Sequence, residues 1–145
     1  MVTAADQGRK TRARLMAAAI ELIATQGWGA VTTRMVAEQA GVRPGLVHYH
    51  FASVDDLLID ASLRLARAEV ENALVGALRT SGLDAISTMI TAIARCTGTD
   101  TPTVVMSEML LAATRHQRLR AEASAVARRR AYGHDRVVAR ALRGE

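Results

Sequence analysis

The sequence predicts an all-α protein. Apolar residues recur at intervals of three and four along most of the chain, the spacing that places them on one face of a helix. β-branched residues nowhere alternate with polar residues over the length of a strand, and only two prolines occur among 145 residues. Because half of the residues are hydrophobic, the chain can bury a core.

The first helix is expected at residues 9–26, after a frayed start at residues 1–8. Gly27 and Gly29, on either side of Trp28, end this helix. Its apolar stripe consists of Leu15, Ala18, Ala19, Leu22 and Ile23.

Two short helices are expected next. Thr32 is the N-cap of the first, which extends to about residue 40. Gly41 follows it, at a position that favours a left-handed backbone. Pro44 opens the second helix, because a residue in the first turn has no intrahelical use for its N–H.

Four more helices complete the chain. Ser53 and Asp56 have the spacing of a capping box, with aspartate in place of glutamate, before a long helix that reaches about residue 79. Thr101 is the expected cap of a later helix, with Pro102 in its first turn. The last three helices are expected at about residues 83–95, 101–114 and 117–142.

The two short helices have the spacing of a helix-turn-helix. Gly41, Val42 and Arg43 form the turn, and Val42 fills the apolar angle between the helices. The second helix is short enough to present its N-terminal residues to base edges in the major groove. A helical hairpin in an ordinary bundle satisfies the same spacing, so the spacing alone is only moderately specific.

The wider pattern resembles a known family. The segment TTRMVAEQAGVRPGLVHYHFASVDDLL, residues 32–58, resembles the DNA-binding domain of the tetracycline-repressor (TetR) family of regulators. The segment RLMAAAIELIATQGW, residues 14–28, is similar to that family's first helix. The resemblance implies a three-helix DNA-binding domain at residues 1–52. A helical ligand-binding and dimerisation domain is then expected at 53–145, without the family's two further C-terminal helices.

The resemblance also implies which residues contact DNA. Arg34 and Arg43 would reach bases or phosphate, since the guanidinium fork suits guanine O6 and N7. His48, Tyr49 and His50 would contact phosphates, which position the protein without specifying sequence. The full set is Thr32, Thr33, Arg34, Arg43, Pro44, Gly45, Leu46, His48, Tyr49 and His50.

Two residues depart from the family pattern. Arg43 occupies a position that often carries a serine cap, which implies that capping is exchanged for a DNA contact. Val54 stands where relatives frequently have a lysine. Losing that phosphate contact predicts a salt dependence that is shallower by about one charge.

An effector cavity is the second site that the resemblance implies. Its expected lining is Met89, Ile93, Met106, Met109 and Leu110. Methionine adapts to irregular apolar shapes, although such a stripe is more often simple core packing.

The resemblance implies a homodimer that binds double-stranded DNA at a palindromic operator and releases it when a small-molecule effector binds. The alternative is a shortened interaction protein that pairs with a full-length regulator and hardly binds DNA. No catalytic constellation or cofactor motif favours an enzyme. His48 and His50 lie about 200° apart on a helix, so they cannot chelate one metal together.

Net charge and cysteine content indicate the class of partner and the cellular compartment. The formal net charge is +5, and residues 1–52 carry six basic against three acidic residues, an excess that suits nucleic acid. Cys96 is the only cysteine, which fits a reducing compartment. No apolar run approaches the ~20 residues needed to span a membrane. We therefore expect a cytoplasmic protein, with the arginines of the last helix on a solvated face or in a second anion contact.

Overall fold

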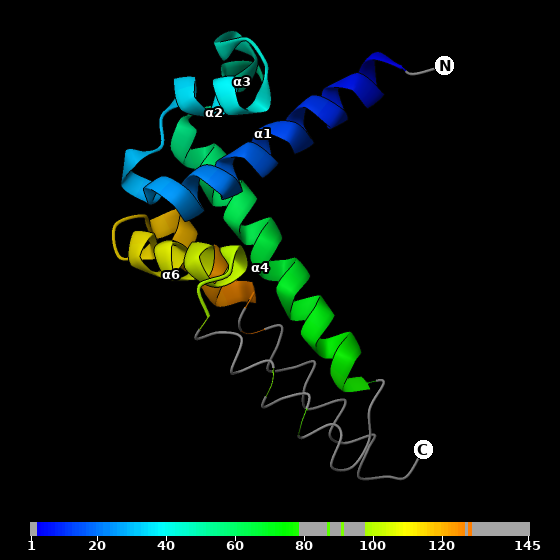
Figure 1. Ribbon diagram of the computed structural model, residues 1–145, viewed down its shortest axis with the longest axis vertical. Helices are drawn as coiled ribbons and strands as arrows, with labels where there is room; N and C mark the ends of the chain where they lie inside the picture. Colours follow the sequence, from blue (N-terminus) through cyan, green and yellow to red (C-terminus); the bar gives the residue numbers. More distant parts are fainter. Residues whose placement is uncertain (1–2, 79–86, 88–90, 92–97, 127, 129–145) are drawn as a thin grey trace.

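The computed structural model describes residues 3–78, 87, 91, 98–126 and 128, and this part of the chain contains helices and no strand (Figure 1). The prediction of an all-α protein is confirmed. The helices are α1 (Ala4–Gln26), the short 3-10 helix η1 (Trp28–Ala30), α2 (Thr33–Ala40), α3 (Pro44–His50), α4 (Val54–Leu78) and α6 (Thr101–Ala113). Residues 117–126 form a further helix.

Helix α1 begins five residues earlier than the sequence predicted. The Thr3 side chain accepts a hydrogen bond from the backbone N–H of Asp6, and the Asp6 carboxylate accepts one from the backbone N–H of Thr3. This reciprocal capping box satisfies two of the N–H groups that a helix start leaves unpaired. The expectation of a frayed start was therefore wrong for residues 3–8.

Helices α2 and α3 lie together at one end of the molecule, beside α1 and the beginning of α4 (Figure 1). The predicted stripe of α1 faces this packing: Leu15, Ala19 and Ile23 are buried, and Leu22 is partly buried. The same buried cluster contains Val36, Ala37 and Ala40 on α2 and Val47 on α3. Helix α4 leaves this end and extends across the molecule (Figure 1).

Helix α6 packs against both α1 and α4. Its N-cap is Asp100, whose carboxylate accepts from the backbone N–H of Thr103 at 3.2 Å, so the prediction that Thr101 caps this helix was wrong. An ionised carboxylate is a stronger acceptor than a hydroxyl and also complements the positive end of the helix dipole. Thr101 is instead the first helical residue.

The core continues from the helix-turn-helix into this second group of helices. Val105 and Met109 on α6 and Leu119 on the 117–126 helix belong to the same buried cluster as Leu15. A polar contact adds to it, because a Glu108 carboxylate oxygen accepts from the backbone N–H of Trp28 at 2.8 Å. The two predicted domains therefore pack directly on each other.

Most of the helix expected at 83–95 and most of the last one lie outside the described residues; the two described residues of the former, 87 and 91, are helical. No helix in the described part of the chain is long and apolar enough to cross a membrane.

Candidate nucleic-acid interface

The turn between α2 and α3 has the backbone geometry that the sequence predicted. The Thr32 side-chain oxygen accepts from the backbone N–H of Met35 at 3.3 Å, which confirms Thr32 as the N-cap of α2. Gly41 has φ 63° and ψ 42°, in the left-handed region. The backbone N–H of Val42 then donates to the Ala37 carbonyl at 2.9 Å, and the Val42 side chain packs against the core. The turn is thus closed by backbone hydrogen bonds and an apolar plug.

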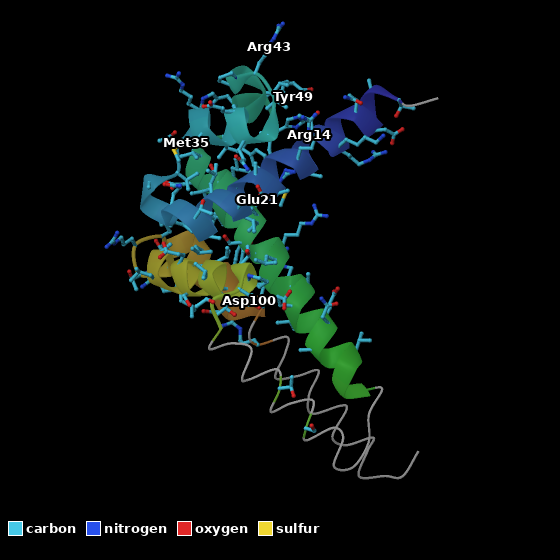
Figure 2. All side chains as sticks on the ribbon, in the orientation of Figure 1. Arg14, Glu21, Met35, Arg43, Tyr49 and Asp100 are labelled. Carbon is cyan, nitrogen blue, oxygen red and sulfur yellow. The ribbon has the colours of Figure 1, made fainter. Side chains whose placement is uncertain are left out.

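Arg14 adds a contact that sequence reasoning missed. Its Nη2 donates to the carbonyl oxygen of Ala40 at 2.6 Å and lies 3.5 Å from that of Gly41. These carbonyls are at the negative end of the α2 dipole, where a cation is favourable. Figure 2 shows Arg14 on α1, on the side that faces the other two helices. The sequence held no signal for this contact, since the partners are 26 and 27 residues apart.

The N-cap residue of α3 does not use its side chain to cap the helix. Arg43 is the N-cap, yet its side chain makes no capping hydrogen bond. Figure 2 shows the Arg43 side chain at the outer end of α3, directed away from the rest of the molecule. Pro44 occupies the first helical turn as predicted. Arg43 therefore does not cap α3 with its side chain, and its contact with DNA stays a prediction.

Helix α3 is held by a single buried side chain and is exposed along the rest of its outer surface. Val47 is fully buried, and Phe51, which ends the helix, is also buried. By contrast, Leu46 is 38% exposed and Tyr49 is 79% exposed. A large aromatic ring left in solvent is a common feature of surfaces that bind a partner.

The ten predicted DNA-binding residues lie on two adjoining short helices and the residues that cap them. Eight of them are exposed: Thr32, Arg34, Arg43, Pro44, Gly45, Leu46, His48 and Tyr49. Thr33 and His50 are partly buried. The His50 ring meets the Tyr49 ring edge-on, with 5.0 Å between the ring centroids, so these two side chains support each other.

The predicted effector residues are only partly described. Met109 is buried in the core, Met106 packs against it, and Leu110 is 63% exposed. Met89 and Ile93 lie outside the described residues. The placement of Met109 fits the core-packing alternative, and the effector cavity stays a prediction. Among the described residues no group of three or more His, Cys, Asp or Glu side chains is arranged to hold a metal ion.

Comparisons with known proteins bear on this helix-turn-helix. The model of the family described as bacterial regulatory proteins, tetR family, matches residues 15–61. The HTH-type transcriptional regulator BetI from Rhizobium meliloti is 38% identical over 68 residues, which make up 47% of this chain and 33% of BetI. The matched region therefore spans about a third of that curated relative.

Three solved structures are similar over a longer stretch. SCO7518 from Streptomyces coelicolor A3(2), a proposed transcriptional regulator, has a TM-score of 0.77 at 25% identity, over 88% of this chain and 75% of its own. The multidrug binding protein EbrR, complexed with imidazole, has a TM-score of 0.67 at 31% identity, over 82% and 64%. A TetR family transcription regulator from Marinobacter aquaeolei VT8 has a TM-score of 0.72 at 15% identity, over 90% and 69%, a likeness of fold alone.

Proposed function

This chain belongs to the TetR family of bacterial regulatory proteins, and we propose that it binds double-stranded DNA through α2 and α3 and thereby regulates transcription. The observation that carries the proposal is the outer surface of α3. It presents Arg43, Leu46, His48 and Tyr49 to solvent while Val47 anchors the helix in the core. Helix α3 has seven residues, and its N-terminal end is the part that enters the groove.

Different side chains on this surface suit different parts of DNA. Arg34 and Arg43 are exposed cations that can donate two hydrogen bonds to guanine O6 and N7 in the major groove. The Tyr49 hydroxyl and the His48 imidazole suit phosphate oxygens, which set register. Leu46 can contact a thymine methyl group. Sequence preference should therefore depend on the arginines and Leu46, and general affinity on Tyr49 and His48.

We further propose that binding is to a palindromic site, by two copies of the chain, and that a small molecule relieves it. The proposal rests on the family relationship and on EbrR, which is described as a multidrug binding protein and was solved with imidazole. A ligand that prefers one arrangement of the helices shifts the DNA-binding equilibrium by its difference in affinity for the two arrangements.

The test begins with selection of duplex DNA from a random pool by the full chain, followed by affinity measurements at two salt concentrations. Arg43→Ala should relax base preference at one position of the selected site, with a cost of about 1–3 kcal/mol if it reads a base. Arg64→Ala is the matched control, because Arg64 is an exposed arginine on α4, outside α2 and α3. Selection of no sequence at all, or equal losses in both variants, would contradict DNA reading by α3.

A second candidate is an interaction protein that pairs with another regulator. It is favoured by Leu110 and Leu111 on α6, which are 63% and 58% exposed and adjacent in sequence. DNA selection separates the two candidates, and light scattering on the purified chain, with and without Leu110→Gln and Leu111→Gln, tests whether the exposed leucines hold copies together. An oligomer that dissociates in these variants, in a chain that selects no DNA, would favour the second candidate.

A further inference from the structure

A cluster of charged side chains joins three parts of the chain that are distant in sequence. It contains Arg12 on α1, Asp56 and Asp60 in the first two turns of α4, and Arg118 and Glu122 on the 117–126 helix. None of these five residues is part of the proposed DNA-binding surface. The cluster lies where the helix-turn-helix meets the second group of helices.

Arg118 holds the beginning of α4 with both arms of its guanidinium. Its Nη1 is paired with an Asp56 carboxylate oxygen, and its Nη2 lies 2.8 Å from an Asp60 oxygen. These aspartates are four residues apart and so are neighbours on one face of α4. The Arg118 Nε donates to Glu122 at 2.9 Å, which fixes the guanidinium on its own helix. Only a planar fork with several donors can make these contacts at once.

From Asp60 the contacts continue to Phe51, at the C-terminal end of α3. The other carboxylate oxygen of Asp60 accepts from Arg12 Nη2 at 2.7 Å. The Arg12 guanidinium carbon lies 4.4 Å from the centre of the Phe51 ring, in cation–π geometry. Phe51 is the residue that ends α3, and its backbone N–H donates to the Val47 carbonyl at 2.9 Å.

A second series of contacts from Arg118 also reaches the link between α3 and α4. Asp56, the other partner of Arg118, accepts from the Ser53 hydroxyl at 2.7 Å, and the Ser53 oxygen accepts from the Asp56 backbone N–H at 3.0 Å. Ser53 lies two residues after Phe51, in the short link between α3 and α4. Both branches from Arg118 therefore reach the three-residue link at residues 51–53.

We propose that Arg118 is a positioning residue for α3, the helix that carries most of the proposed DNA-binding surface. It ties the placement of the 117–126 helix to the C-terminal end of α3, through Asp60, Arg12 and Phe51 and through Asp56 and Ser53. Movement of the 117–126 helix changes the constraint on α3 without any contact between Arg118 and DNA. The consequence for DNA affinity rests on the proposed function, whereas the constraint on α3 does not.

The constraint is tested by hydrogen exchange in the full chain without DNA. Arg118→Gln should raise the exchange rates of the amides at residues 44–52 by about two- to fivefold, the range for loss of partly exposed ion pairs. Exchange at residues 15–23 of α1 should stay unchanged. Arg120→Gln is the matched control, an exposed arginine on the same helix, and should leave both segments unchanged.

Two results would overturn the proposal. One is unchanged exchange at residues 44–52 in Arg118→Gln. The other is an equal increase at both segments, which would mean that Arg118 stabilises the whole fold and does not position α3. Arg118→Lys adds a further check, because lysine keeps the charge but not the fork, so exchange at 44–52 should be intermediate.

A double-mutant cycle tests the route through Asp60. If Asp60 transmits the effect, Arg118→Gln should change exchange at residues 44–52 less in an Asp60→Asn background than in the native chain. Purely additive effects would overturn this route. On the duplex selected by the native chain, Arg118→Gln should weaken binding while Arg120→Gln does not. A native chain that selects no duplex would refute the proposed function and leave the exchange test intact.

Discussion

The guanidinium of Arg14 on α1 donates to the carbonyl oxygen of Ala40, the last residue of α2, at 2.6 Å. One long side chain thereby caps the C-terminal end of α2, at the point where the backbone turns through Gly41 toward α3. The contact ties α1 to the end of α2, beside the turn that leads to α3.

Replacing Arg14 with glutamine should lower the free energy of unfolding by about 1 kcal/mol, the usual net contribution of one hydrogen bond. The reason is loss of the charged donor at the negative end of α2. Urea unfolding followed by far-UV circular dichroism measures the change. Lys10→Gln, an exposed cation one turn earlier on α1, is the control and should be neutral. Equal effects in the two variants would contradict a specific role for Arg14.

Two glycines of the helix-turn-helix should respond in opposite ways to alanine. Gly41→Ala should destabilise the protein by about 1–2 kcal/mol, because alanine pays a steric cost in the left-handed region. Its Cβ would also lie 3.3 Å from Arg14 Nη2. Gly45 sits in α3 with open space around its Cβ position, so Gly45→Ala should be neutral or stabilising. Thermal unfolding of both variants checks the contrast, which a stable Gly41→Ala protein would refute.

Tyr49→Ala should weaken DNA binding without affecting stability. The ring is 79% exposed, so its removal should change the free energy of unfolding by less than about 0.5 kcal/mol. A phosphate contact would be lost from every DNA sequence, so affinity should fall about equally for selected and random duplexes. Fluorescence anisotropy with both duplexes measures this. A loss confined to the selected duplex would show that Tyr49 reads a base.

The capping box at the start of α1 should be lost at acid pH. Hydrogen bonds from the Thr3 side chain, and then from its backbone N–H, hold the pKa of Asp6 below its ordinary value. A depressed folded-state pKa means that the capping box contributes fully above the unfolded value of about 3.9 and is lost as pH falls through the folded pKa. An NMR titration of the Thr3 and Asp6 amides should show a midpoint below 3.9. Asp6→Asn should abolish the titration, and a midpoint at or above 3.9 would contradict the assignment.

Local patterns predicted much of the helix-turn-helix. Thr32, Gly41 and Pro44 each act within a few residues of their own position, so cap, turn and first-turn chemistry could be read directly. The same local logic failed at Thr3, where the capping partner Asp6 was overlooked, and at Asp100, a better acceptor one residue before the expected cap. These errors moved helix ends by a few residues and left the order of the helices unchanged.

The long-range partners of the arginines could not be predicted from the sequence. The sequence predicted a solvated face or an anion contact for the arginines of the last helix, yet Arg118 pairs with Asp56 and Asp60, about sixty residues earlier. Arg12 and Arg14 likewise find partners in other helices. An arginine side chain is long and has many rotamers, so its position in the sequence does not define which group it reaches.

The sequence by itself therefore determined the helical class and the turn of the helix-turn-helix, because these depend on spacing and on backbone preferences within a few residues. The residues expected on the outer surface of α3 came from the family resemblance. Only the tertiary structure decided how that motif is held: by Arg14 at the end of α2, and by Arg118 through Asp60 and Arg12 at the end of α3. Those contacts form only after the apolar faces have packed, since packing is what brings the distant side chains within hydrogen-bonding distance.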